Sequence, residues 1–363
     1  MTDRLSIRGG ADLHLRDVLA AAVARGAQVT LACGRAEPDA APPPGVAVVT
    51  VRGLSRMVTD PRRLSKLAPL LAQADVVHAQ NVMNPVALAQ ITATGRAIVT
   101  VQDHRVFCPG PGKTLPDGDR CQRTMGEGTC AACLPEPGYR ARVLALTEAR
   151  RAALAGARLV VLSQYMADEL AAVGLPGAAV VPPWIGVPED AQQRRDVFVL
   201  GGRLVAHKDS LRAWRAWDAA GRPLPLVVAG AGPLADEMHG AEHAGWLERP
   251  ALLALLQRAR ALLFPARWQE PFGILGAEAL ACGAPVVTTP RGGMADWAQA
   301  GCIQADSDGA MRDAIARLAA DPDGARALGA AGRDAVRGAF SAATLSARLW
   351  TLYEEVRCSA PPT

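Results

Sequence analysis

Two carboxylates, Glu270 and Glu278, stand eight residues apart on either side of a predicted helix start. The apolar run 261–264 is followed by a proline and predicts a buried strand. The small residues after Gly273 predict a helix that ends near Gly283. The first carboxylate is therefore expected in a loop and the second inside the helix.

The start of this helix is expected to bind an anion or an electron-rich oxygen. The first backbone N–H groups of a helix have no partner inside it, and the helix dipole is positive at that end. Carboxylates beside such a site accept strong hydrogen bonds from sugar hydroxyls. The alternative is an acidic loop residue followed by an ordinary exposed glutamate. The N–H groups concerned are those of Phe272, Gly273 and Ile274.

A second group of polar residues follows a glycine-rich strand end, in the segment Gly201-Gly-Arg-Leu-Val-Ala-His-Lys208. Arg203 and Lys208 combine a forked guanidinium with a compact ammonium, and both are suited to neutralising a diphosphate. The chain has only three lysines, so one at this position is informative. A solvated pair of loop cations is the alternative.

Together these segments resemble the signature of the family 4 retaining glycosyltransferases, which have the GT-B fold and use nucleotide-activated sugars. The likeness covers nearly the whole chain and is most specific from Gly201 to Gly293. It implies that Arg203 and Lys208 bind the donor diphosphate, that Glu270 contacts the transferred sugar, and that Glu278 accepts from the ribose hydroxyls. The further donor-binding residues that it implies are Gly202, Gly230, Gly232, Trp246, Phe272, Gly273 and Ile274.

The N-terminal half departs from the family pattern at two places. Gly9 and Gly10 resemble the loop that approaches the donor phosphates, but only eight residues precede them, which predicts an unusually short first strand. Either Met1 is not the natural start, or the edge of the first sheet is curtailed. Where many relatives carry a histidine that touches the donor sugar, this sequence has Gln102, and His104 is displaced by two positions. We take His104 as the candidate catalytic residue, with a capping or core role as the alternative.

A cysteine-rich segment, residues 108–135, is expected to form a flap over the acceptor side. Four thiolates can hold zinc tetrahedrally, and metal binding is favoured over disulfides if the chain is cytosolic. The spacing is looser than that of a zinc ribbon, so disulfides or free thiols remain alternatives. The four candidate ligands of a structural zinc ion are Cys108, Cys121, Cys130 and Cys133.

Length and composition set the broad class of protein. The 363 residues are half apolar, enough for two well-cored domains, and the net charge of +4 is too small to indicate nucleic acid as a partner. The sequence contains neither a signal-peptide core nor an apolar run of roughly 20 residues, which predicts a cytoplasmic protein. The basic, leucine-containing segment 52–74 suggests peripheral contact with the inner face of a membrane, against the alternative of a solvated helix face.

Short β-rich runs alternate with helical stretches, which predicts an α/β fold with two Rossmann-like parallel-sheet domains facing across a cleft. We expect an acceptor domain over residues 1–188, a donor domain over 189–340 and a final helix, 341–363, that returns to the first domain. The linker is expected near 186–195. The predicted strands are 27–33, 46–51, 75–79, 97–102, 158–163, 196–200, 225–229, 260–264 and 285–288.

The resemblance implies sugar transfer from a nucleoside diphosphate sugar to an unknown acceptor, with retention at the anomeric carbon and no catalytic metal. An NAD-dependent oxidoreductase is a weaker alternative, because Gly230-Ala-Gly-Pro-Leu-Ala235 imitates a dinucleotide fingerprint. Two further alternatives are a nucleotide-sugar epimerase of the same fold and a non-catalytic scaffold. Three Asp-x-Asp triplets are expected to be solvated turns, at residues 117–119, 306–308 and 321–323.

Overall fold

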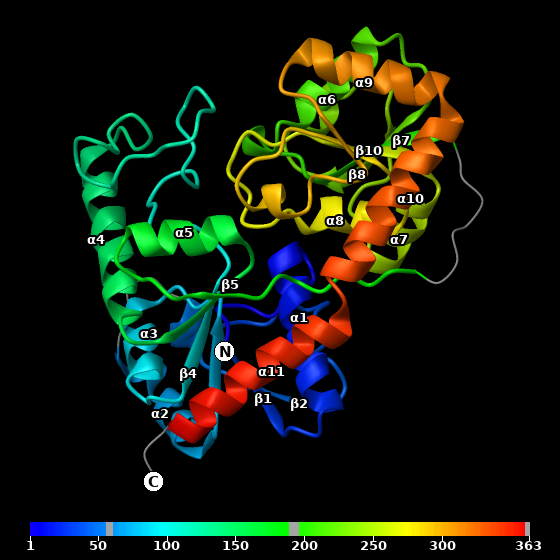
Figure 1. Cartoon of the computed structure of the whole chain (residues 1–363). Helices are drawn as coiled ribbons and strands as arrows, with labels where there is room; N and C mark the ends of the chain where they lie inside the picture. The colour runs from blue at the N-terminus through cyan, green and yellow to red at the C-terminus, as the bar shows by residue number, and fades with distance from the viewer. Residues whose placement is uncertain (56–60, 189–195, 360–363) are drawn as a thin grey trace. The chain divides into compact units, whose positions relative to one another are not determined.

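The computed structural model describes residues 1–55, 61–188 and 196–359 (Figure 1). The chain forms two compact units. Unit 1 contains Met1–Pro116, Cys121–Pro183 and the chain from Ala343 onward; unit 2 contains Asp117–Arg120 and Trp184–Ala342. The linker expected at 186–195 falls mostly outside the described residues.

Unit 1 contains two parallel sheets, one with the order β1-β2 and one with the order β3-β4-β5-β6. Parallel strands need crossover connections, which the intervening helices supply. The strands are β1 (Val29–Cys33), β2 (Val46–Thr50), β3 (Val77–Gln80), β4 (Ala97–Val101), β5 (Arg158–Val161) and β6 (Ala179–Val180).

The N-terminal segment joins these two sheets. Thr2 forms a parallel bridge with Cys33 on one side, while the Met1 carbonyl accepts from the Gln80 N–H and the Asn81 carbonyl accepts from the Asp3 N–H on the other. The first strand is short, as the sequence predicts, but it does not lie at a sheet edge. This short segment lies between β1 and β3, because its two sides find backbone partners in different sheets.

Helices of unit 1 begin at recognisable caps and bury an apolar face. Asn84 accepts from the Val86 and Ala87 N–H groups, and Ser163 accepts from Met166. Unit 1 has α1 (Gly10–Ala24), α2 (Leu67–Gln73), α3 (Pro85–Thr92), α4 (Pro137–Ala153), α5 (Gln164–Ala172), nearly all of α11 (Ala342–Ser359) and the short 3₁₀ turns η1 (Arg52–Ser55) and η2 (Pro61–Leu64).

Unit 2 is a six-stranded parallel sheet with the order β12-β11-β10-β7-β8-β9. Counted along the chain from β7, this is the strand order 3-2-1-4-5-6 of a dinucleotide-binding Rossmann domain. The order reverses between β7 and β10, which are neighbours at the centre of the sheet. The strands are β7 (Val197–Arg203), β8 (Leu226–Ala231), β9 (Glu242–His243), β10 (Ala259–Phe264), β11 (Val286–Thr288) and β12 (Cys302–Gln304).

Helices complete unit 2 around the buried strands. The buried apolar cluster of the unit includes Phe198 and Leu263 from the sheet and Trp217 from α6. The helices are α6 (Ser210–Ala219), α7 (Arg249–Gln257), α8 (Ile274–Ala281), α9 (Asp308–Ala320) and α10 (Pro322–Ala339), with the 3₁₀ turns η3 (Ala206–Lys208), η4 (Ala235–Glu237) and η5 (Gly293–Asp296).

The predicted α/β fold with two Rossmann-like parallel-sheet units is confirmed, and so is each of the nine predicted strands. Pattern reasoning missed β6, β9 and β12, which are only two or three residues long. The three Asp-x-Asp triplets lie in turns or at helix starts: Asp117 accepts from the Asp119 N–H, Ser307 caps α9 and Asp321 caps α10.

Candidate active site

The two signature segments meet at the point where the strand order of unit 2 reverses. The Arg203–Lys208 loop follows β7, and the loop from Pro265 to Gly273 follows β10. Because both strands are parallel neighbours, both loops leave the same carboxyl edge of the sheet. In open α/β sheets this crevice is where ligands bind.

An ion pair connects these loops. The Lys208 ammonium contacts the Glu270 carboxylate, and it lies 5.1 Å from the ring centroid of Trp268. Glu270 is only 4% exposed, so this close cation offsets part of the cost of burying a carboxylate. The Glu270 carbonyl also accepts from the Gly293 N–H at 2.7 Å, which anchors the loop from behind.

Helix α8 begins as the sequence predicts, with Gly273 as its N-cap in the left-handed conformation (φ 83°). A side chain at Gly273 would be strained there and would also approach Met294 and Trp297 at 3.0 and 3.1 Å. Among the described residues, none accepts a hydrogen bond from the N–H groups of Phe272, Gly273 or Ile274. These three donors and the positive end of the helix dipole are therefore available to an anion.

Glu278 lies inside α8 and is 4% exposed. Its Oε1 accepts from Arg249 Nε at 2.8 Å, where Arg249 is the first residue of α7. A carboxylate this deeply buried is costly unless it is paired. Arg249 therefore stabilises the charged form of Glu278 and orients it.

Arg203 is exposed and forms no ion pair within the described part of the chain. Burial and then the charges of Lys208 and Arg203 lower the pKa of His207. His207 lies between the two cations in sequence, and its ring contacts Trp268 with centroids 5.0 Å apart. The loop is thus positively charged at the crevice, as binding of a diphosphate requires.

The glycines expected in the nucleotide pocket are required for close backbone packing. A Cβ at Gly230 would lie 2.0 Å from the Gly202 carbonyl oxygen, and one at Gly232 would lie 2.3 Å from the Leu204 carbonyl oxygen. The segment after β8 forms only the three-residue η4, not the long helix of a dinucleotide fingerprint. Trp246, in the loop after β9, is 40% exposed.

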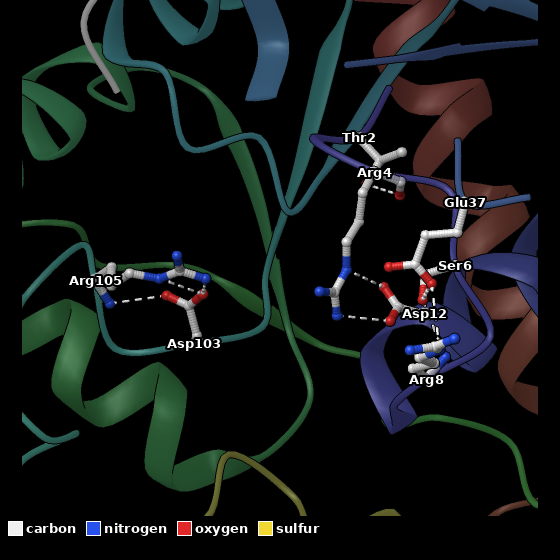
Figure 2. A network of polar contacts seen from close by, with 8 residues as sticks. All are labelled: Thr2, Arg4, Ser6, Arg8, Asp12, Glu37, Asp103 and Arg105. Atoms are coloured by element: carbon white, nitrogen blue, oxygen red, sulfur yellow. Dashed lines mark hydrogen bonds and ion pairs between the residues drawn. The ribbon is translucent and has the colours of Figure 1, made fainter. Parts of the chain in front are cut away.

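In unit 1, a polar network supports the loop of Gly9 and Gly10 (Figure 2). Arg4 Nη2 lies 2.8 Å from Asp12 Oδ2 in the first turn of α1. Ser6 donates to Glu37 at 2.8 Å and accepts from the Arg8 N–H at 3.0 Å. The glycine pair therefore leads into α1 from a segment whose charges are locally matched.

The two candidate positions for the family histidine have different surroundings. Gln102 is buried, and its Nε2 lies 2.6 Å from His14 Nδ1, which Gln80 Nε2 also approaches at 3.0 Å. His104 is 2% exposed, and its Nε2 lies 3.1 Å from the Tyr165 hydroxyl. Burial lowers the pKa of His14 to about 4, so this imidazole is neutral at pH 7.

Two family models match the chain. The model described as Glycosyltransferase Family 4 matches residues 8–187, and the model described as Glycosyl transferases group 1 matches residues 188–335. The chain belongs to the family 4 glycosyltransferases. The two matches meet between residues 187 and 188, next to the beginning of unit 2.

Relatives and solved structures agree with this family. The glycogen synthase of Mycobacterium tuberculosis is 32% identical over 114 residues, which are 30% of this chain and 27% of the relative. The match therefore spans only about a quarter of that protein. Sucrose-phosphate synthase from Thermosynechococcus elongatus has a similar structure (TM-score 0.69, 18% identity, 99% of this chain and 96% of the other). So does Anabaena Alr3699/HepE in complex with UDP-glucose (TM-score 0.68, 15% identity, 96% and 97%).

The predicted zinc site does not form in this family member. No group of three or more His, Cys, Asp or Glu side chains that could hold a metal ion occurs among the described residues. Cys108 Sγ accepts from the Lys113 N–H at 3.2 Å, whereas the thiols of Cys121 and Cys133 approach the carbonyls of Arg123 and Thr114. All four cysteines, including Cys130, are free thiols. Cys108, Cys121 and Cys133 each contact a nearby backbone group.

The leucines of the basic segment, residues 52–74, pack in the core of unit 1. Leu54, Leu64 and Leu67 are buried, whereas Arg62, Arg63 and Lys66 are exposed. Arg56 lies outside the described residues. Because these leucines pack inward, the described residues of this segment expose basic side chains rather than leucines. No helix in the described ranges is long and apolar enough to cross a membrane.

Three residues near the candidate site were not found by sequence reasoning. Trp268 has a weak signal, as an aromatic residue two positions before Glu270. Arg249 pairs with a glutamate 29 residues away, and His14 meets glutamines 66 and 88 residues away. Separations of this size carry no local periodicity, so only the fold identifies these partners.

Proposed function

We propose that the protein transfers a sugar from a nucleoside diphosphate sugar to an acceptor hydroxyl, with retention at the anomeric carbon. The observation that carries this proposal is the contact between Lys208 and Glu270 at the strand-order reversal of unit 2. Residues 189–340 would then bind the donor and residues 1–188 the acceptor. The UDP-glucose in the Anabaena structure supports a nucleotide-sugar donor.

The donor diphosphate would lie between Arg203 and Lys208, against the free N–H groups at the start of α8. Its charge competes with Glu270 for the lysine ammonium, and the released carboxylate can accept hydrogen bonds from the sugar hydroxyls. Glu278, held by Arg249, is suited to accepting from the ribose hydroxyls. Lys208 thus has an anionic partner both before and after the donor binds.

Retention would follow if the acceptor oxygen attacks the anomeric carbon on the same face of the sugar from which the diphosphate departs. The bond between the anomeric carbon and the diphosphate oxygen breaks, and a bond to the acceptor oxygen forms. The acceptor proton passes to the departing diphosphate. Arg203 and Lys208 stabilise the negative charge that develops there, which is a large effect in group transfer.

Nucleotide binding and turnover test this function. UDP, GDP or ADP should raise the melting temperature, since a ligand of the native state stabilises it. Lys208→Ala and Glu270→Ala should each abolish transfer with the fold intact, whereas the control Arg215→Ala, at an exposed position on α6, should not. NMR of the product's anomeric proton checks retention. Full turnover in either site variant would refute the assignment.

The same screen separates the alternatives. Stabilisation by NAD alone would indicate an oxidoreductase, and conversion of the sugar nucleotide without a glycosylated product would indicate an epimerase. Nucleotide binding without any turnover would indicate a scaffold. We further propose a cytoplasmic location and electrostatic contact with an anionic membrane surface through Arg62, Arg63 and Lys66, tested by salt-sensitive sedimentation with anionic vesicles.

A further inference from the structure

A small cavity of about 20 Å³ lies in unit 1 where the neighbouring strands β3 and β4 end. Residues directly after both strands line it, as they would line the ligand crevice of an open parallel sheet. The cavity has room for one water-sized atom. Its polar lining includes Asn81, Gln102, Asp103 and Arg150.

Arg150 is the residue that requires an explanation. It projects from α4 and is 3% exposed, although arginine is almost never fully buried without a partner of opposite charge. Its Nε donates to the Met83 carbonyl at 2.8 Å, and its Nη1 lies 3.5 Å from the Arg105 carbonyl. No carboxylate pairs with it among the described residues, and its buried Nη2 has no hydrogen-bond partner.

The neighbouring carboxylate forms no hydrogen bond with Arg150, whose described partners are backbone carbonyls. Asp103 is bound by Arg105, with Nε and the backbone N–H each 2.9 Å from its carboxylate oxygens (Figure 2). Arg105 therefore occupies both carboxylate oxygens of Asp103, which also lines the cavity. Arg150 is left without a hydrogen-bonded or ion-paired carboxylate among the described residues.

Two further features of the lining are unusual. Gln102 Oε1 is buried without a partner, so an acceptor as well as a donor is unsatisfied at this cavity. Asn81 has a left-handed backbone (φ 60°), a conformation that costs energy and is concentrated at functional sites. Unmatched polar atoms and backbone strain are both typical of a site built for a ligand.

We propose that this cavity receives one oxygen of a phosphate or carboxylate group on the acceptor substrate, bound by Arg150 Nη2. The rest of the acceptor lies outside the cavity, and the Gln102 amide accepts from a hydroxyl next to the anionic group. The proposal rests on the transferase function above and adds the acceptor class. The acceptor is anionic close to the hydroxyl that is glycosylated.

Matched pairs of compounds test the proposal. Wild-type protein is titrated calorimetrically with glycerol and glycerol 3-phosphate, and with glucose, glucose 6-phosphate and glucuronate. The anionic member of a pair should bind at least about ten-fold more tightly. Vesicles of phosphatidylglycerol distinguish a lipid phosphate from a soluble one. Equal affinity within every pair would overturn the proposal.

Variants then assign the effect to Arg150. Arg150→Gln should remove the preference for the anion, and Arg150→Lys should retain part of it, because one charge remains without the fork. Arg151→Gln, the next residue on α4, is the control and should keep the preference. If Arg150→Gln does not fold, Arg150→Lys is used instead. An unchanged preference of Arg150→Lys for the anionic compound would refute the role of the guanidinium fork.

Nucleotide binding keeps the two proposals separate. Stabilisation by a nucleoside diphosphate should be the same in Arg150→Gln and in the wild type, since Arg150 is not one of the expected donor-binding residues, most of which belong to unit 2. Nucleotide binding without any anion preference refutes the acceptor class alone. Absence of nucleotide binding refutes the transferase function itself.

Discussion

At the scale of single residues, the candidate donor site consists of buried carboxylates that depend on cations. Glu270 and Glu278 are each 4% exposed, and each is in contact with a basic side chain. Burial makes such a charge expensive, and one charged hydrogen bond offsets part of that cost. The partners Lys208 and Arg249 therefore stabilise these buried carboxylates and orient them.

Arg249→Ala should weaken nucleotide binding, although Arg249 is not one of the expected donor-binding residues. Loss of the 2.8 Å contact leaves Glu278 without this cation, which should cost about 1–3 kcal/mol. We expect the KM for the donor to rise more than kcat falls, with partial rescue by Arg249→Lys. Calorimetric titration with the nucleoside diphosphate measures this.

A double-mutant cycle with Glu278→Gln provides the control. If Arg249 acts through Glu278, the double variant should be little worse than Glu278→Gln alone. Additive losses would show that Arg249 acts independently of that carboxylate.

At the scale of elements, the start of α8 is shaped by small residues packed against Trp297. The Trp297 indole N–H donates to the Phe272 carbonyl at 2.6 Å, which holds the loop that precedes the helix. A Cβ at Gly276 would lie 2.0 Å from the Trp297 ring. The glycines of this segment therefore allow the tryptophan to fix the position of the free N–H groups.

Gly276→Ala should lower the free energy of unfolding by about 1–3 kcal/mol, because the ring or the helix must move to admit one methyl group. It should also weaken nucleotide binding by displacing the helix start. The matched control is Gly338→Ala in α10, where a Cβ meets no atom within 4 Å. There the higher helix propensity of alanine should raise the free energy of unfolding by up to about 1 kcal/mol. Urea unfolding measures both, and equal effects would contradict the packing role.

At the scale of the whole molecule, each unit has its own buried apolar cluster and its own parallel-sheet framework. Unit 1 also contains two histidines that are neutral at pH 7, the buried His14 and the half-buried His78. Burial lowers the pKa of His14 to about 4, and burial followed by nearby positive charge lowers the pKa of His78 to about 3. The His78 Nδ1 lies 2.7 Å from the Tyr353 hydroxyl, so this neutral ring contributes to the attachment of α11 within unit 1.

These histidines predict sensitivity to acid. The unfolded chain takes up protons near pH 6.5, whereas the native His14 does so only near pH 4. The unfolded state binds more protons between these values, so stability is complete above about pH 6.5 and is lost as the pH falls. His14 should contribute a slope of up to about 1.4 kcal/mol per pH unit in this window.

Urea unfolding of His14→Gln between pH 4.5 and 7 checks this prediction. In His14→Gln, the slope of the free energy of unfolding against pH should decrease by the His14 contribution. The control His239→Gln, at an exposed position, should leave this slope unchanged. An unaltered slope in His14→Gln would show that the imidazole is protonated in the native state.

The sequence alone was sufficient for the features that depend on local order. Short β-rich apolar runs located nine strands, and a proline, a glycine and a run of small residues located the loop and helix around Glu270 and Gly273. Such signals arise from steric and hydrogen-bonding preferences of neighbouring residues, which are present before the chain folds. The two signature segments could be recognised for the same reason.

Only the tertiary structure decided which distant side chains share one environment. The pairs Arg249–Glu278 and His14–Gln102 depend on strand order and on the crossing of helices, neither of which has a local signature. The cysteine spacing permitted a zinc site, but the described residues form no such metal-binding group. In the folded segment, Cys108 and Cys133 contact nearby backbone groups instead. The unpaired charge of Arg150 appears only after the core has closed around it, because burial and the absence of a partner are properties of the packed chain.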